Sequence, residues 1–309
     1  MRRLSPLMVA FVLLASCASE GSGSPTTTAP SDTTAARPCV GRTDRRDVAY
    51  IAGDDPLQRL DIYLPEGVGC DPVPVVVWVH GGGWQIGDKR NSITQKVALW
   101  NDAGWAVVSV NYRLSDSAVP EAERVMAPEH NEDVAAALGW LVEHSADVGI
   151  DPNHVALLGH SAGAGIVAAL ATDPVYLRAA GLEPADLSCV GPLDTEAFSV
   201  AEAIGGGPEL SKVYRVAFGT DPDQWAELSP LTHVGEAAIP PLFLVSRGAA
   251  SRRNLVATFA AAVDTASGET AIVDLPTFSH EDVNKRIGDP ADTRLTPALQ
   301  EFLTACLAG

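Results

Sequence analysis

Short apolar runs separated by longer amphipathic stretches dominate the chain from about residue 47 onward. The runs have the length and near-continuous apolar character of buried strands, and most stretches between them repeat apolar residues at helical spacing. The expected strands are residues 73–79, 105–110, 155–158, 187–190, 242–245 and 271–275, and the expected helices are 91–103, 129–148, 164–171, 251–266 and 297–307. This alternation predicts an α/β fold, with a mainly parallel sheet and helices on both faces.

Two regions depart from the alternation. Residues 47–52 and 58–64 have alternating polar and apolar positions around Gly-Asp-Asp-Pro at 53–56, which predicts an antiparallel hairpin at the start of the fold. Residues 195–234 are helical only in places, so we expect a small cap region there.

One serine lies where such a fold can expose a nucleophile. Gly-His-Ser-Ala-Gly, at residues 159–163, stands between an expected strand and an expected helix. In that setting the central serine occupies a strained turn at the carboxyl end of the sheet, although an ordinary glycine-rich turn can have the same letters. His-Gly-Gly-Gly-Trp at 80–84 and the late His280 complete the chain order of an α/β-hydrolase, which favours Ser161 as the nucleophile.

From residue 47 to the C-terminus the chain resembles the α/β-hydrolase esterases of the hormone-sensitive-lipase-like group and the related bacterial carbohydrate-acyl esterases. The resemblance rests on the motifs at 80–84 and 159–163, with Asn-Tyr-Arg-Leu at 111–114, Asp-Pro at 151–152 and Ser-Pro-Leu at 229–231. It implies an α/β-hydrolase fold without a cofactor, and an oxyanion hole formed by the backbone N–H groups of Gly82, Gly83 and Ala162. The spacing of Cys and His residues indicates no metal site.

A serine hydroxyl needs a base to take its proton, and the chain has seven histidines. Only His280 falls in the loop after the last expected strand, where this fold has its histidine, so we expect His280 to be the base. We expect His80 to brace the glycine-rich loop rather than to transfer a proton. Trp84, Met126 and Trp225 are candidates for lining a substrate pocket.

The acid that orients the histidine is harder to place. The resemblance puts it after the strand at 242–245, but no carboxylate lies between Pro240 and Val263. The preceding strand runs toward Asp194 at the same sheet edge, so Asp194 is our candidate. Glu281 and Asp282 are nearer to His280 in sequence but poorly oriented, and a site without an acid stays open.

The first 16 residues precede the fold. Arg2 and Arg3 are followed by an apolar core of signal-peptide length, and Leu-Ala-Ser-Cys at 14–17 resembles the lipobox of bacterial lipoproteins. We expect Cys17 to carry lipid, residues 17–38 to form a flexible Ser/Thr/Pro/Gly tether, and residues 39–309 to form the hydrolase domain. The protein would then lie on the outer side of a bacterial cytoplasmic membrane, with the lipid as its membrane contact; plain secretion is the alternative.

The net charge bears on the kind of partner, and the cysteine count predicts disulfides. Removal of residues 1–16 takes two arginines from the 21 basic residues, which leaves 19 against 39 acidic residues, or −20, and argues against nucleic acid as a partner. Four cysteines remain after Cys17, and an even number in an exported protein predicts two disulfides, in one of three connectivities. The four cysteines are Cys39, Cys70, Cys189 and Cys306. A disulfide between the last two would join a late strand to the last helix.

Together these features predict a serine carboxylesterase that hydrolyses a small or medium acyl ester through an acyl-enzyme on Ser161. Two alternatives remain: an amidase or arylformamidase on the same scaffold, and a non-catalytic cell-surface binding protein that keeps the fold.

Overall fold

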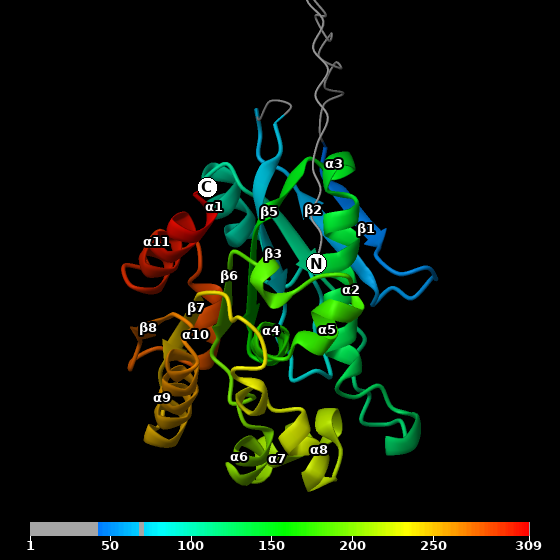
Figure 1. Ribbon diagram of the computed structural model, residues 1–309, viewed down its shortest axis with the longest axis vertical. Helices are drawn as coiled ribbons and strands as arrows, with labels where there is room; N and C mark the ends of the chain where they lie inside the picture. Colours follow the sequence, from blue (N-terminus) through cyan, green and yellow to red (C-terminus); the bar gives the residue numbers. More distant parts are fainter. Residues whose placement is uncertain (1–42, 68–70, 309) are drawn as a thin grey trace, which may run out of the picture. The chain divides into compact units, whose positions relative to one another are not determined.

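A computed structural model describes residues 43–67 and 71–308 of the chain. At its centre is an eight-stranded sheet with the order β1-β2-β4-β3-β5-β6-β7-β8 (Figure 1). The hairpin of β1 (Arg45–Ala49) and β2 (Arg59–Tyr63) is antiparallel, and β2 also pairs antiparallel with β4. All other neighbours are parallel, as the alternation of strands and helices predicts.

The remaining elements follow in chain order. The strands are β3 (Val73–Val79), β4 (Ala106–Val110), β5 (Ile150–His160), β6 (Cys189–Leu193), β7 (Leu242–Ser246) and β8 (Thr270–Asp274). The helices are α1 (Thr94–Asp102), α2 (Glu129–Glu143), α3 (Ser145–Val148), α4 (Ala162–Thr172), α5 (Pro174–Ala179), α6 (Val200–Gly205), α7 (Pro208–Phe218), α8 (Pro222–Glu227), α9 (Ala250–Thr265), α10 (His280–Lys285) and α11 (Leu295–Leu307).

Strand β3 shows why the sheet needs helices on both faces. Its side chains alternate between the two faces, and both sets are buried. Val75 and Val77 lie in a core shared with α2, α4 and α9, whereas Val76 and Trp78 lie in a second core shared with α1, α10 and α11. The nearly continuous apolar run at 73–79 is the sequence signature of such a doubly covered strand.

Some element boundaries differ from the predictions. The expected helix at 129–148 is divided into α2 and α3 because the backbone leaves helical geometry at His144 (φ −100°, ψ 11°). Strand β6 begins and ends later than the expected 187–190, since Gly191 and Pro192 interrupt the apolar pattern of its second half. The short helices α5 and α10, with six residues each, were not predicted.

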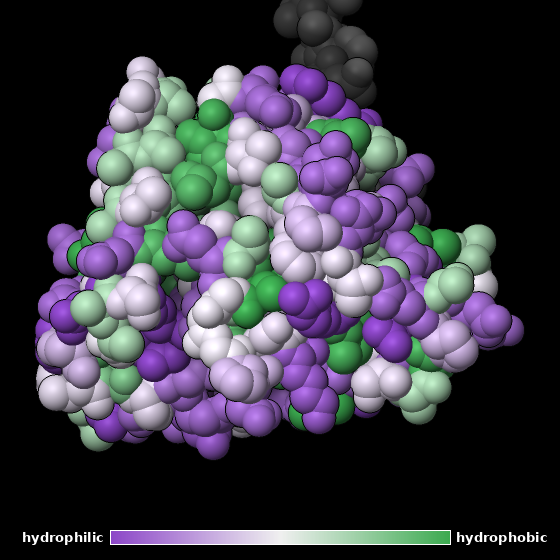
Figure 2. All heavy atoms as spheres, turned by 90° about the horizontal axis from the view of Figure 1, so that it is seen from below, coloured by the Kyte–Doolittle hydropathy of each residue, from purple (hydrophilic) through white to green (hydrophobic). Residues whose placement is uncertain are grey.

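The cap region consists of α6, α7 and α8, which lie together at one end of the molecule (Figure 1). Seen from that end, the surface is mostly hydrophilic, with hydrophobic residues in separate patches (Figure 2). No helix within residues 43–67 and 71–308 is long and apolar enough to cross a membrane.

One of the disulfides is present in the structure. Cys189 at the start of β6 is bonded to Cys306 in α11, with their Cα atoms 6.1 Å apart, so it joins a late strand to the last helix as expected. Cys39 and Cys70 lie outside the described residues. The same holds for the signal peptide, Cys17 and the tether.

Candidate active site

The parallel strands bring the candidate residues to one edge of the sheet. The register pairs Val79 with Gly159 and His160 with Leu193. The residues that follow these strand ends, including Ser161 after β5 and Asp194 after β6, are therefore neighbours. The backbone N–H of Ser161 donates to the carbonyl of Leu193 at 3.2 Å, which fixes this arrangement.

Ser161 lies in a sharp turn between β5 and α4. Its φ of 57° and ψ of −116° are unusual for a residue with a side chain and are the kind of strain found at functional turns. The turn is closely packed: a Cβ atom at Gly159 would lie 2.3 Å from the carbonyl oxygen of Gly163, and one at Gly163 would lie 2.3 Å from that of Val79. Glycine is therefore required at both positions that flank the serine.

Ser161, His280 and Asp194 form a continuous hydrogen-bonded chain. The Oγ of Ser161 lies 2.8 Å from Nε2 of His280, and Nδ1 of His280 lies 2.6 Å from Oδ2 of Asp194. An ionised carboxylate only accepts hydrogen bonds, so Nδ1 carries the proton in this contact. That tautomer leaves Nε2 free to accept the proton of Ser161. The structure thus brings together the three residues that the sequence singles out.

Asp194 is buried, with 1% of its side chain exposed. Burial raises the pKa of Asp194, but the hydrogen bond from His280 and the charges of Arg252 and Arg247 outweigh it and hold the pKa below its usual value. Asp194 is therefore ionised near neutral pH, as the acid of a catalytic triad must be.

Two arginines that sequence analysis did not identify surround this carboxylate. Nε of Arg247 donates to Oδ2 of Asp194, and Nε of Arg252 donates to Oδ1 at 2.8 Å. Arg252 also pairs with Glu196. A signal was present in the sequence: Arg247 directly follows β7, at the strand end where the resemblance leads one to expect an acid.

The two other candidate acids are engaged elsewhere. Asp282 accepts hydrogen bonds from the backbone N–H and the hydroxyl of Ser279, at 2.8 and 2.7 Å, in a capping box at the start of α10. Glu281 pairs with Lys285 one turn later in the same helix. His280 is the first residue of α10 rather than part of an irregular loop, and 37% of its side chain is exposed.

The glycine-rich loop lies beside Ser161. Gly82 and Gly83 have φ values of 123° and 61°, and among the hydrogen bonds of the described residues none uses the N–H of either glycine. Ala162 is the first residue of α4, so its N–H belongs to the helix N-terminus and has no acceptor within the helix. The ring of His80 stacks on Tyr112 at 4.5 Å, and the Tyr112 hydroxyl donates to the His80 carbonyl, which braces the loop.

His160, inside the serine motif, connects the end of β5 to the start of α10. Burial, together with the nearby His280, lowers the pKa of His160 to about 3, so its ring is neutral. Its Nε2 lies 3.0 Å from the carbonyl oxygen of His280, to which it donates. This bond holds the start of α10 against the end of β5 and thereby helps to place the His280 ring.

Ser161 lines two cavities. One, of about 480 Å³, is lined by the glycine-rich loop together with Ile86, Asn91, Ser92, Glu281 and Asn284. The other, of about 220 Å³, lies under the cap and is lined by Trp84, Leu210, Val213 and Tyr214, among others. Of the three predicted pocket residues, Trp84 lines the smaller cavity, whereas Met126 and Trp225 line neither of the two.

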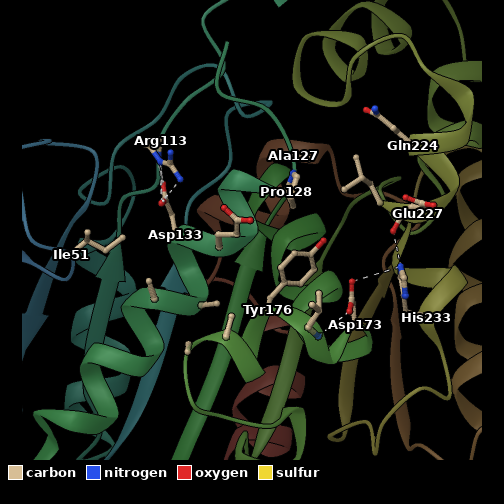
Figure 3. A pocket seen from close by; sticks show the side chains of 17 residues that line it. Ile51, Arg113, Ala127, Pro128, Asp133, Asp173, Tyr176, Gln224, Glu227 and His233 are labelled. Atoms are coloured by element: carbon tan, nitrogen blue, oxygen red, sulfur yellow. Dashed lines mark hydrogen bonds and ion pairs between the residues drawn. The ribbon is translucent and has the colours of Figure 1, made fainter. Parts of the chain in front are cut away.

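A larger cavity of about 1010 Å³ lies away from Ser161, between α2, α5 and α8 (Figure 3). Arg113 pairs with Asp133 on one side of it, and His233 lies 3.7 Å from Asp173 on the other.

Two groups of side chains in the described residues have ligand atoms close enough to hold a metal ion. The first group is His160, Asp194 and His280, and the second is Asp173, His233 and Glu236. In the first group, Nε2 of His160 is bonded to the backbone carbonyl of His280. The ring nitrogens of His280 and the carboxylate of Asp194 are bonded to one another, to Ser161 or to the arginines.

Comparison with known proteins points to esterases. A family model described as BD-FAE matches residues 60–177, which include the glycine-rich loop and Ser161 but not Asp194 or His280. The chain is 38% identical to carboxylesterase NlhH of Mycobacterium tuberculosis over 42% of its own length and 38% of that protein. It is 31% identical to esterase LipC of the same organism, over 66% of its length and 50% of LipC. The chain thus spans half or less of the length of these relatives.

Solved structures support the fold over a longer part of the chain. A truncated carbohydrate esterase from gut microbiota aligns with a TM-score of 0.69 at 19% identity, over 86% of this chain and 97% of that protein. Inhibited esterase B from Lactobacillus rhamnosis aligns with a TM-score of 0.70 at 21% identity, over 85% and 86%. The predicted α/β-hydrolase fold is thereby confirmed.

Proposed function

We propose that this protein is a serine ester hydrolase in which Ser161 is the nucleophile, His280 the base and Asp194 the acid. The observation that carries the proposal is the chain of hydrogen bonds from Ser161 Oγ through His280 to Asp194, at 2.8 and 2.6 Å. The esterase names of the relatives support ester hydrolysis. A fold that had become a binding module would have no need of this alignment.

The reaction proceeds in two steps. His280 Nε2 takes the proton of Ser161 as Oγ attacks the acyl carbonyl, and the negative charge that forms on the carbonyl oxygen is stabilised by the N–H groups of Gly82, Gly83 and Ala162. His280 then returns the proton to the departing alcohol, which leaves an acyl-enzyme on Ser161. Water, activated by His280, attacks this ester and releases the acid.

The cavities favour a short acyl group. The cavity under the cap, about 220 Å³, is smaller than the roughly 300–1,000 Å³ of pockets that hold drug-sized ligands, and Leu210 and Val213 of α7 form part of its wall. We therefore place the acyl group there. The cavity of about 480 Å³, which Asn91, Ser92 and Asn284 help to line, takes the alcohol.

A panel of p-nitrophenyl esters of rising acyl length tests this assignment. The wild type is expected to have its highest kcat/KM with about two to four acyl carbons, because each further methylene would overfill the small cavity. Leu210→Ala should move the optimum to longer chains because it removes part of that wall. Fastest cleavage of the longest ester by the wild type would contradict the assignment. Faster cleavage of the matching p-nitroanilide would favour an amidase.

We further propose that the enzyme acts outside the cytoplasmic membrane and is held there by a lipid on Cys17. The proposal is supported by the lipobox-like residues 14–17 and by the polar tether that follows them. In a bacterial host the full chain should partition into the detergent phase and Cys17→Ala into the aqueous phase. Equal partition of the two proteins would indicate plain secretion.

A further inference from the structure

We infer that Arg247 is a positioning residue for this site: its guanidinium fixes the direction in which the Asp194 carboxylate meets His280. The inference rests on the proposed function, in which Asp194 orients the base. Arg247 directly follows β7, and 10% of its side chain is exposed. Its Nε donates to Oδ2 of Asp194, and its Nη2 lies 2.9 Å from Nδ1 of His280.

The hydrogen bonds of the carboxylate show how this works. Oδ2 of Asp194 has two lone pairs, and it receives Nε of Arg247 on one side and Nδ1 of His280 on the other. A guanidinium has no acceptor, and Nδ1 already uses its proton for Asp194. The approach of Nη2 to Nδ1 is therefore a contact between two donors, which arises because Nε of the same guanidinium and Nδ1 of His280 both donate to Oδ2. Arg247 thus leaves only one lone pair of Oδ2 available, and that lone pair faces His280.

The backbone of Asp194 explains the need for such support. Its φ is 68°, in the left-handed region that residues with a side chain seldom occupy. It follows β6 rather than β7, so the carboxylate must reach across the end of β7 to meet His280. The strand end that it passes carries Arg247, a permanent cation with a planar, rigid set of donors. The position after β7 therefore supplies the counter-ion of the acid.

Arg252 has a different part in the same cluster. It bonds to Oδ1 at 2.8 Å and to the backbone carbonyl of Asp194 at 3.2 Å, and it also pairs with Glu196. None of these contacts involves the oxygen that faces His280. Loss of Arg247 should therefore affect the geometry of the base more directly than loss of Arg252.

The test compares Arg247→Gln and Arg247→Lys with Arg253→Gln in the full chain. Arg253 is a matched control because it lies in the first turn of α9, close in sequence to Arg247, and is exposed. Within the described residues, the one hydrogen bond of its guanidinium is to the carbonyl of Gly248, at 3.3 Å. Arg247→Gln should lower kcat by about 10- to 100-fold, the effect of losing one hydrogen bond to a charged group. Because Arg247 also lines the cavity under the cap, the loss is read from kcat and not from KM. Arg247→Lys should recover part of kcat, and Arg253→Gln should match wild type.

A spectroscopic measurement separates this role from a structural one. The Nδ1 proton of His280 in its short bond to Asp194 should give a downfield proton NMR signal, absent in His280→Ala. The signal should shift or disappear in Arg247→Gln and persist in Arg253→Gln. An unchanged signal together with an unchanged kcat in Arg247→Gln would overturn the inference. If the wild type cleaves no ester, the proposed function fails, and the NMR signal still decides whether Arg247 positions the pair.

Discussion

Replacement of Ser161 by alanine is expected to lower kcat for a short-chain p-nitrophenyl ester by about 10⁶-fold, the size of effect seen when a serine protease loses its nucleophile. The reason is that no other hydroxyl occupies the turn at the end of β5, where Oγ lies 2.8 Å from the base. Since the elbow geometry is set by the backbone and by the flanking glycines, the variant should fold. Its residual activity then reports what the oxyanion loop contributes alone.

A fluorophosphonate probe gives a second measurement of the same prediction. It should label wild-type protein covalently and leave Ser161→Ala unlabelled. Ser251→Ala is the control, because Ser251 is exposed and lies at the start of α9, outside both cavities at the site. Equal labelling of Ser161→Ala and Ser251→Ala would remove Ser161 from the mechanism.

The ease of finding Ser161 in the sequence reflects how locally its setting is encoded. Strand, turn and helix are consecutive in the chain, and Gly159 is required by a backbone contact within the motif. Gly163 is required by a contact with Val79 of the neighbouring strand, but it belongs to the same recognisable motif. The buried strand at 73–79 was found for a similar reason, since a run covered on both faces is apolar at nearly every position.

Asp194 is encoded less locally than Ser161. No motif marks it, but the order of parallel strands restricts which strand ends can approach the histidine. That topological argument pointed to Asp194, whose carboxylate lies 2.6 Å from Nδ1 of His280 in the structure. Arg247 and Arg252 were not identified from the sequence. Their contacts depend on how three separate segments pack together, and neither periodicity nor spacing predicts that packing.

Short helices were missed because six residues contain too little of a period to be recognised. Helix α10 did carry one readable signal: Ser279 followed three residues later by Asp282 forms a capping box. Reading that pair as a helix start would have placed His280 in the first turn and would have shown that Asp282 is committed to the cap.

The second large effect is expected at Asp194, where replacement by asparagine should lower kcat by about 10⁴-fold, by analogy with the aspartate of a serine protease. Asparagine keeps the size of the side chain, but its amide can donate to Nδ1 and so stabilise the tautomer in which Nε2 carries the proton. That tautomer cannot accept the proton of Ser161. The expected change is therefore mainly in kcat, with little effect on KM.

Two further variants make this prediction specific to Asp194. Asp282→Asn removes a carboxylate that caps α10 and Glu281→Gln one that pairs with Lys285, and neither carboxylate bonds to the ring of His280. Both should keep kcat within a few-fold of wild type. The melting temperature must be measured for all three proteins, because Asp194→Asn also leaves Arg247 and Arg252 without their shared counter-ion. A folded Asp194→Asn enzyme with nearly wild-type kcat would mean that Ser161 and His280 act as a dyad, and that the buried carboxylate serves only to neutralise the two arginines.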